Sequence, residues 1–250
     1  MPHDHAIQCL HDPLLVALSY LVSILGSFTA LQLAIGIPAA TDNSGRWRAI
    51  TASGVAMGGG AIWAMHFIAM LACKMDTPVS YHLGLTALSA VIAMASCMAG
   101  LAIASTGVFA WSKLVIAGVF MGLGVTGMHY TGMAAMLMPA DTHYSTPLVA
   151  ASAGIAIVAS MAALWLAFNL RGPLQMLGSA LVMGVAVCGM HYTGMAAATF
   201  VPNEAGDTAL AGGLSGSYLG MGIFAVTTVL LAVTLSLNML RQRQRKLVQI

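Results

Sequence analysis

The sequence predicts an all-α membrane protein of seven transmembrane helices, built as three parallel two-helix repeats plus a C-terminal helix. Three observations predict it: the composition, the series of apolar stretches, and one short motif that occurs three times. Of the 250 residues, 59% are hydrophobic and only 6% are charged. Soluble domains carry about 25% charged residues. The chain therefore cannot cover a water-exposed surface and is predicted to lie in a lipid bilayer.

The apolar stretches are long enough to cross a membrane as helices. About 20 apolar residues cover the roughly 30 Å hydrocarbon core of a bilayer. Prolines and most of the charged residues fall between the stretches, as expected at helix ends. We expect seven spans, at Leu14–Ile37, Ala49–Cys73, Leu83–Ser105, Ser112–Met138, Leu148–Leu170, Gln175–Phe200 and Ser217–Leu240.

The basic residues predict the orientation. Cytoplasmic loops carry an excess of Lys and Arg, and eight of the nine basic residues fall on one side of the predicted spans: Arg46, Arg48, Lys113, Arg171, Arg241, Arg243, Arg245 and Lys246. We therefore expect the N-terminus outside and the C-terminus inside. Met1–Pro13 contains no Lys or Arg, so a cleaved signal peptide is not expected. The basic tail is expected to anchor to lipid headgroups.

An internal repeat organises the first six spans. Ala64–Met70 aligns with Gly127–Met133 and with Gly189–Met195, and the histidines of the three copies are 63 and 62 positions apart. Each copy falls in an even-numbered span, so the helix pairs run in one direction and are related by an axis along the membrane normal. We expect an outer segment at 1–13, a six-helix repeat domain at 14–206, and a seventh helix with a basic tail at 207–250.

The repeated motif predicts a metal site. Each histidine has a methionine four positions later, so both side chains lie on one helix face. The helical rise places the imidazoles roughly 10–15 Å below the outer boundary, where the three repeats can bring them together. Neutral imidazole is a metal ligand, and thioethers beside it favour copper, particularly Cu(I). The predicted ligands are His66, His129, His191, Met65, Met70, Met128, Met133, Met190 and Met195.

Several neighbours extend or compete with this prediction. Cys73 and Cys188 are candidate additional ligands, and Tyr130 and Tyr192 are expected to support their histidines by hydrogen bonds. The four cysteines show no disulfide pattern. Alternatively the histidines are packing residues, or two of them hold a haem as axial ligands. The dense glycines of the same helices favour close helix packing over room for a haem. The outer histidines are expected in solvated loops or, with Cys9, on a metal-capturing surface: His3, His5, His11, His82 and His143.

The motif also carries a resemblance to a known family. Met128–Thr131 and Met190–Thr193 spell Met-His-Tyr-Thr, and Met65–Ile68 is a variant with Phe67 and Ile68. The chain resembles, over roughly residues 10 to 206, the MHYT domain, a bacterial integral-membrane sensor module. The resemblance implies a sensor of a diatomic gas (O2, CO or NO) or of redox state, which binds copper through the motif's Met and His residues. It also implies residence in the bacterial inner membrane.

The same resemblance suggests the partners. Family members commonly continue into domains that make or degrade cyclic di-GMP, or into kinase domains, so a cytoplasmic signalling domain or protein is the expected output. Nothing follows Ile250 in this sequence. Either the chain is a stand-alone sensor with a separate partner, or it is the membrane part of a longer protein.

Two other functions compete with a sensor. A copper transporter or chaperone would need ligands in the inner half, where Met57, Met94, Met121 and Met183 are available but no histidine is. A haem-containing redox protein would use the motif histidines as axial ligands. No nucleophile–base constellation, Walker motif or dinucleotide fingerprint occurs. We therefore expect no nucleic-acid partner and no enzymatic activity other than one carried by the metal.

Overall fold

The computed structural model describes residues 7–108, 110–169, 172–203 and 210–248, and within them the fold is helical with a few short strands. Six helical segments are long and apolar enough to cross a membrane. They are α1 (Pro13–Ala34), the continuous α2–η1–α3 (Asn43–Val55, Ala56–Trp63 and Ala64–Ala72), α4 (Leu83–Ala104), α5 (Trp111–Ala134), α6 (Thr146–Asn169) and α7 (Pro173–Ala196). A further helix, α8 (Gly216–Val248), has an apolar part at Gly216–Val229. The all-helical membrane class is confirmed.

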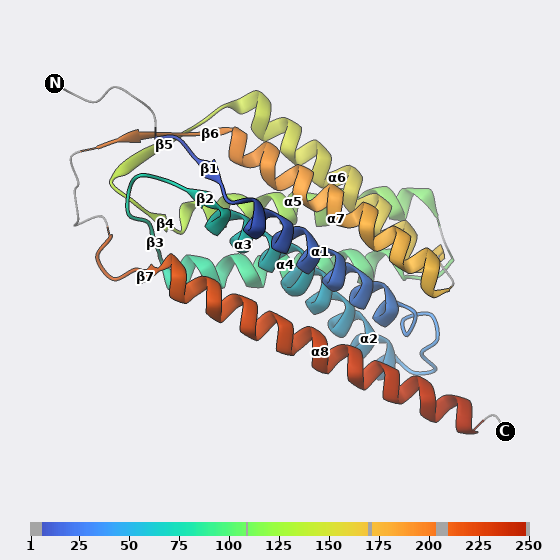
Figure 1. Ribbon diagram of the computed structural model, residues 1–250. Coiled ribbons are helices and arrows are strands. Elements are labelled where there is room, and N and C mark those ends of the chain that lie inside the picture. Colours follow the sequence, from blue (N-terminus) through green and yellow to red (C-terminus); the bar gives the residue numbers. More distant parts are fainter. Residues whose placement is uncertain (1–6, 109, 170–171, 204–209, 249–250) are drawn as a thin grey trace.

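The six long segments close into a ring. Helix α1 packs against α3 and α7, α4 packs against η1 and α5, and α6 packs between α5 and α7. The motif helices α3, α5 and α7 also contact one another, so they meet inside the ring. Helix α8 runs along the outside of this bundle against α1, η1 and α3 (Figure 1). The arrangement therefore places the three motif segments at the centre.

Glycines allow the neighbouring helices to pack closely. A Cβ on Gly26 of α1 would lie 2.5 Å from the Ala61 nitrogen of η1. In the same way a Cβ on Gly122 of α5 would lie 2.5 Å from Cα of Ile157 in α6. Such distances are too short for any side chain. The glycines are needed because the helix backbones touch, as expected for packing through small residues.

The first motif helix contains an eight-residue π-helix, η1. Nine positions separate Met57 from His66, whereas eight separate Met121 from His129 and Met183 from His191. The first repeat thus has one residue more than the others between these positions. A π-helix accommodates an extra residue without rotating the flanking turns out of register. It therefore lets Met57 and His66 keep the same faces as their counterparts.

Short antiparallel strand pairs tie the ends of each repeat together. Strand β1 (Leu10–His11) pairs with β2 (Cys73–Lys74), β3 (Ser80–Tyr81) with β4 (Met136–Leu137), and β5 (Ala140–Tyr144) with β6 (Ala198–Pro202). A fourth pairing joins β7 (Leu214–Ser215) to β3. In each repeat, the strand before the first helix pairs with the strand after the motif helix. We call these three pairs the strand clamps.

Equivalent backbone hydrogen bonds complete the strand clamps. The amides of Asp12, His82 and Ser145 donate at 2.8 Å to the carbonyls of Ala72, Ala135 and Ala197, respectively. All three clamps lie at one end of the bundle (Figure 1). We call this end the strand end. The repetition of these bonds gives the three helix pairs equivalent closures.

The structure corrects two sequence-based expectations. Helices α5 and α7 end at Ala134 and Ala196 rather than at Met138 and Phe200, because the chain continues there into strands. Cys9 and Cys73 form a disulfide, with their Cα atoms 5.2 Å apart, although no disulfide was expected. His82 is exposed and precedes α4, in agreement with a solvated loop position, and its Nδ1 accepts from the Leu85 amide at 3.2 Å and caps that helix.

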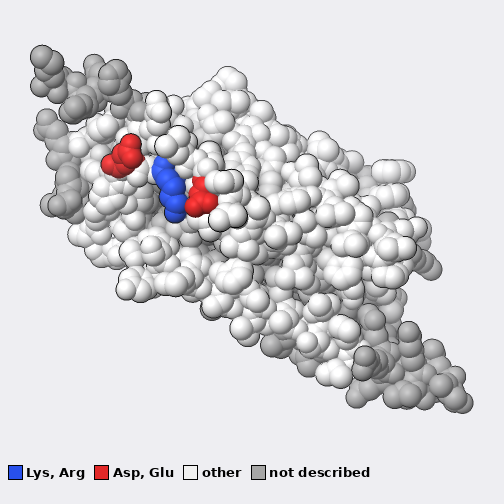
Figure 2. Space-filling view, viewed as in Figure 1, with Lys and Arg blue, Asp and Glu red and all other residues white. Residues whose placement is uncertain are grey.

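Charged side chains are rare on the surface. Figure 2 shows a small group of acidic and basic side chains near the strand end and an otherwise uncharged flank. At the opposite end the Arg46 guanidinium donates to Ser105 Oγ at 3.0 Å, and the Lys113 ammonium donates to the Thr106 carbonyl at 2.8 Å. The uncharged flank between these ends is the surface expected to face lipid.

Candidate metal centre

The three motif histidines meet on the axis of the bundle. His66, His129 and His191 are 1%, 0% and 0% exposed. The Nδ1 atom of His66 lies 3.0 Å from that of His191 and 3.1 Å from that of His129. Their ring centroids are 4.8–5.3 Å apart and the rings are nearly perpendicular to one another. We call these three side chains the histidine triad.

The triad has the donor set of a metal site. A neutral imidazole carries one N–H and one lone pair, on different nitrogens. The Nδ1 atom of His66 is therefore either a donor or an acceptor, and it cannot make a full hydrogen bond to both neighbouring histidines at once. The Nε2 atoms of all three histidines are buried and have no hydrogen-bond partner among the described residues. A cation between the three Nδ1 atoms would bind three lone pairs at once. Nitrogen ligands of a tetrahedral metal lie about 3.3 Å apart, close to the distances found.

Two motif glycines hold the triad in place. A Cβ on Gly132 or Gly194, each three positions after a motif histidine, would overlap Nε2 of His66 or His129, respectively. Each of these imidazoles therefore rests on the glycine of the next repeat. Ala69 takes the corresponding position in the first repeat and is fully buried. The motif supplies both the ligands and the space into which they fit.

The residue after each histidine packs against its ring. Phe67, Tyr130 and Tyr192 make edge contacts with their histidines at centroid distances of 4.9, 4.8 and 5.0 Å. The Tyr130 hydroxyl lies 2.9 Å from Ser152 Oγ, on α6. Tyr130 is thus placed by a hydrogen bond to a neighbouring helix and supports His129 through its ring. Phe67 can replace tyrosine at this position because the contact with the imidazole is made by the ring.

The six motif methionines surround the triad in two groups. Those before the histidines, Met65, Met128 and Met190, belong to a core cluster that extends away from the strand end. Those four positions after, Met70, Met133 and Met195, belong to a second cluster with residues of the strand end, such as Tyr81 and Phe200. All six are buried. The histidines therefore lie between two layers of thioethers.

The two cysteine candidates are placed differently. Cys73 is in the disulfide with Cys9, so it does not offer a thiolate in this state. Cys188 is half-buried in α7 and lies beside Ser19 of α1 rather than in the triad. Cys97, expected to be a small packing residue, is fully buried. Neither Cys73 nor Cys188 joins the triad.

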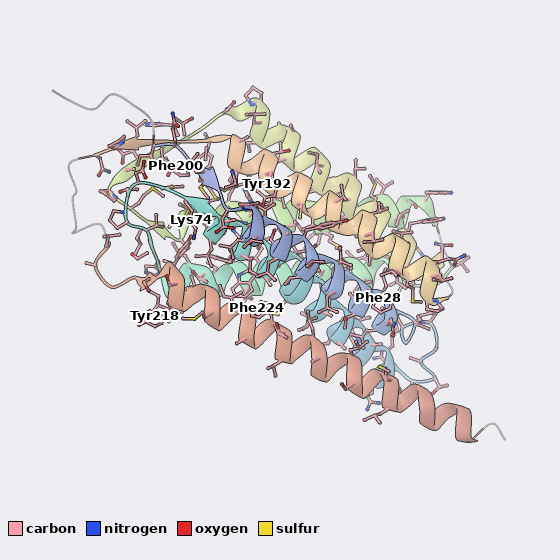
Figure 3. All side chains as sticks on the ribbon, in the orientation of Figure 1. Phe28, Lys74, Tyr192, Phe200, Tyr218 and Phe224 are labelled. Atoms are coloured by element: carbon pink, nitrogen blue, oxygen red, sulfur yellow. A yellow bond between two sulfur atoms is a disulfide. The ribbon has the colours of Figure 1, made fainter. Side chains whose placement is uncertain are left out.

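One of the outer histidines, His11, lies near the triad. The His11 ring contacts Tyr192 at a centroid distance of 5.4 Å, and Tyr192 contacts His191. Figure 3 shows Tyr192 toward the strand end, as it does Lys74 and Phe200. His143 is exposed on β5, and His3 and His5 lie outside the described residues. No pattern in the sequence distinguished His11, because its approach depends on the pairing of β1 with β2.

Comparison with known proteins gives a consistent result. The family model MHYT, described as a bacterial signalling protein N-terminal repeat, matches residues 59–117, 122–180 and 184–249. Each matched segment begins seven residues before a motif histidine and includes the following helix, so α8 falls within the third. The expected repeat domain, residues 14–206, ends before this helix, whereas the third matched segment includes it.

Curated relatives are signalling proteins. The chain is 39% identical over 239 residues to the bifunctional diguanylate cyclase/cyclic di-GMP phosphodiesterase MucR of Pseudomonas aeruginosa, covering 93% of this chain and 34% of that protein. It is 37% identical over 197 residues to the cyclic di-GMP phosphodiesterase NbdA of the same organism, covering 76% and 25%. The signaling protein YkoW of Bacillus subtilis is 31% identical over 208 residues, covering 78% and 25%. The chain thus spans a quarter to a third of these relatives. No solved structure matches it.

Proposed function

This chain belongs to the MHYT family of bacterial signalling proteins, and on that premise we propose that it is a copper-binding membrane sensor. In this proposal His66, His129 and His191 hold the copper, and the protein detects a diatomic gas (O2, CO or NO) or redox state. The observation that carries the proposal is the approach of three buried imidazoles with their Nδ1 atoms 3.0 and 3.1 Å apart.

Copper suits this donor set. Imidazole binds copper well, and neighbouring thioethers favour its reduced form. Bound copper would supply a Cu(I)/Cu(II) couple and a coordination position for a diatomic ligand. The protein contributes three oriented nitrogens, a surrounding layer of methionines and aromatic rings, and exclusion of bulk water.

Haem is less well supported as the cofactor. Two axial histidines hold a haem from opposite faces of the porphyrin, with the iron between them. The three imidazoles of the triad instead contact one another edge to face at 4.8–5.3 Å. A porphyrin would have to separate rings that pack together here. The close approach of the three rings favours a single small ion.

Helix α8 is the proposed route to the output. Its Leu231 packs where a Cβ on Gly60 would overlap it, and its Gly220 lies against Leu71 of α3. Helix α8 thus follows the first motif helix on both sides of His66. A change of packing around the triad would alter these contacts and reach the end of the bundle away from the strands.

Cyclic di-GMP enzymes are the proposed partners. Two relatives bear the names of a cyclic di-GMP cyclase/phosphodiesterase and of a cyclic di-GMP phosphodiesterase. The N-out orientation proposed from the basic residues puts the C-terminal tail in the cytoplasm, where cyclic di-GMP enzymes act. We therefore propose that this membrane domain regulates such an activity.

Metal analysis of the detergent-purified protein tests the proposal. We expect stoichiometric copper without a haem absorption band, and a loss of copper affinity of about tenfold or more when His66, His129 or His191 is changed to alanine. His143→Ala, at an exposed site on β5, is the matched control and should keep its copper. Unchanged copper binding in all three folded triad variants would refute the triad as the site.

A further inference from the structure

A second group of metal-ligating side chains lies at the strand end, outside the histidine triad. Cys9 and Cys73 are joined by a disulfide, and His11 is the cross-strand partner of Cys73 in the β1–β2 pair. The Cys9 sulfur lies 3.6 Å from Nε2 and 3.9 Å from Nδ1 of His11. Two sulfurs and an imidazole are thus gathered within one strand clamp.

The backbone holds the three residues together independently of the disulfide. The Asp12 amide donates to the Ala72 carbonyl at 2.8 Å, next to the pair of His11 and Cys73. The Ile7 amide donates to the Phe200 carbonyl at 2.9 Å, on the other side of Cys9. Because hydrogen bonds flank the group on both sides, we expect reduction of the disulfide to leave the thiols close together.

The spacing fits a metal ion. Metal–sulfur bonds of about 2.3 Å and metal–nitrogen bonds of about 2.0–2.1 Å at a tetrahedral angle separate the two ligand atoms by about 3.6 Å. Cys9 Sγ and His11 Nε2 have this separation. The two sulfurs would only need to move apart after the bond between them is broken.

The group is open to solvent and close to the triad. His11 is exposed and both cysteines are half-buried. A cavity of about 650 Å³ is lined by Cys73 together with Met70 and Met75. On the inner side, the Tyr192 ring contacts both His11 and His191, at centroid distances of 5.4 and 5.0 Å. An ion bound here would lie at the outer approach to the triad.

We propose that Cys9, Cys73 and His11, when the disulfide is reduced, form a second metal site that binds Cu(I) and is closed by oxidation. Thiolate ligands select soft ions such as Cu(I), and a disulfide offers no thiolate. The site thereby makes copper uptake at the strand end dependent on the thiol redox state. It uses none of the triad histidines and does not depend on the triad binding metal.

An external thiol reductant opens the site by reducing the disulfide. The reductant supplies two electrons and two protons, the Cys9–Cys73 sulfur–sulfur bond breaks, and the reductant becomes its own disulfide. Binding of Cu(I) then releases the two thiol protons to water as two copper–sulfur bonds form. His11 contributes the lone pair of Nε2.

The test compares copper binding by the oxidised and the reduced full-length chain, purified in detergent without oxygen and titrated with Cu(I) against a chromogenic chelator. We expect the reduced protein to bind one more copper ion, with a thiolate–copper absorption that imidazole and thioether ligands cannot give. Copper should also protect Cys9 and Cys73 from alkylation. His11→Ala should keep the thiols but weaken the additional site by about tenfold or more.

Four variants make the outcome decisive. Cys9→Ser and Cys73→Ser should each abolish the difference between oxidised and reduced protein, while Cys188→Ser, which removes a free cysteine elsewhere, should keep it. A variant with all three triad histidines changed to alanine should also keep the difference, which separates this proposal from the proposed sensor site. Equal copper content in the oxidised and reduced wild-type protein, with alkylation of the reduced Cys9 and Cys73 unaffected by copper, would overturn the second site.

Discussion

At the scale of single residues, the histidine triad depends on small neighbours as much as on the ligands. Gly132 and Gly194 lie beneath the imidazoles of His66 and His129, where no side chain can fit. Each of these glycines contacts the histidine of the preceding repeat, so one copy of the motif provides the space that the histidine of another copy needs. A substitution of one of these glycines can therefore displace a ligand although every ligating residue is unchanged.

Gly132→Ala and Gly194→Ala are expected to displace one imidazole each and to lower copper affinity by about tenfold or more. The measurement is copper binding by the purified variants. Gly127→Ala and Gly189→Ala are matched controls in the same two helices, because nothing lies within 4 Å of a Cβ at these positions. Equal copper affinity in all four variants would show that the imidazoles do not need this space.

Because Tyr81 is buried, we expect the folded protein to lose stability at alkaline pH. Tyr81 lies outside the helical spans, in β3, and burial raises the pKa of its phenol well above the usual 10.0. Since the folded-state pKa is the higher one, its contribution to stability is full below pH 10.0 and falls as the pH rises towards the folded-state pKa. Tyr81→Phe should reduce this alkaline loss in thermal unfolding followed against pH. An identical pH profile in the two proteins would contradict it.

The three histidines could be predicted because their motif recurs in the sequence. Other site residues could not, because they belong to no repeated pattern. Three identical spacings indicated one common depth for His66, His129 and His191, and the structure brings them together. Spacing also placed Met70, Met133 and Met195 on the helix face of the histidines, but it cannot tell which of two layers a thioether joins. The Cys9–Cys73 disulfide closes a 64-residue separation, and only the folded chain brings its ends together.

At the scale of elements, the π-helix η1 is the main departure from three equal repeats. It takes up the additional residue of the first repeat and leaves both Met57 and His66 buried in the core. The sequence contains this extra residue, but an alignment based on the motif alone does not show where the helix absorbs it. The two-residue strands were missed because they are too short to show a period of two.

Deletion of Gly59 from η1 is expected to leave the fold and copper binding intact, because it gives the first motif helix the spacing of the other two. Deletion of Leu123, an exposed residue of the regular helix α5, should rotate His129 by about 100° relative to the start of its helix. That deletion should abolish copper binding. Copper content and helix content measured on both deletion variants check the contrast. Loss of binding on deletion of Gly59 would show that the π-helix itself is required.

At the scale of the whole molecule, the bundle separates its chemistry from its basic charge. The strand clamps, the disulfide and His11 lie at one end, and Arg46 and Lys113 lie at the other. The sequence predicted that the histidine motif would lie toward the side opposite the basic loops, because the apolar stretches locate the spans and the basic residues indicate the sides. The closed ring of six segments depends on contacts between distant helices, such as α1 with α7, which hydropathy does not reveal.

The orientation itself remains a prediction that labelling can test. In a Cys188→Ser background, a cysteine introduced by Asp141→Cys on β5 should react with a membrane-impermeant maleimide in intact cells. One introduced by Ser44→Cys beside Arg46 should react only after the cells are permeabilised. The reverse pattern would place the triad near the cytoplasmic face and would overturn the proposed direction of signalling.

The strand clamps hold the helices at one end only, and this asymmetry has a mechanical consequence. Strand pairs hold the bundle near the triad, whereas at the other end the helices of each pair are joined by short connections, so the helices can tilt about the strand clamps. A motif helix of 24 residues, such as α5, is about 36 Å long. A tilt of about 5° at the clamped end would move its opposite end by about 3 Å over that length. Displacements too small to repack the triad would thus be magnified where the basic tail begins.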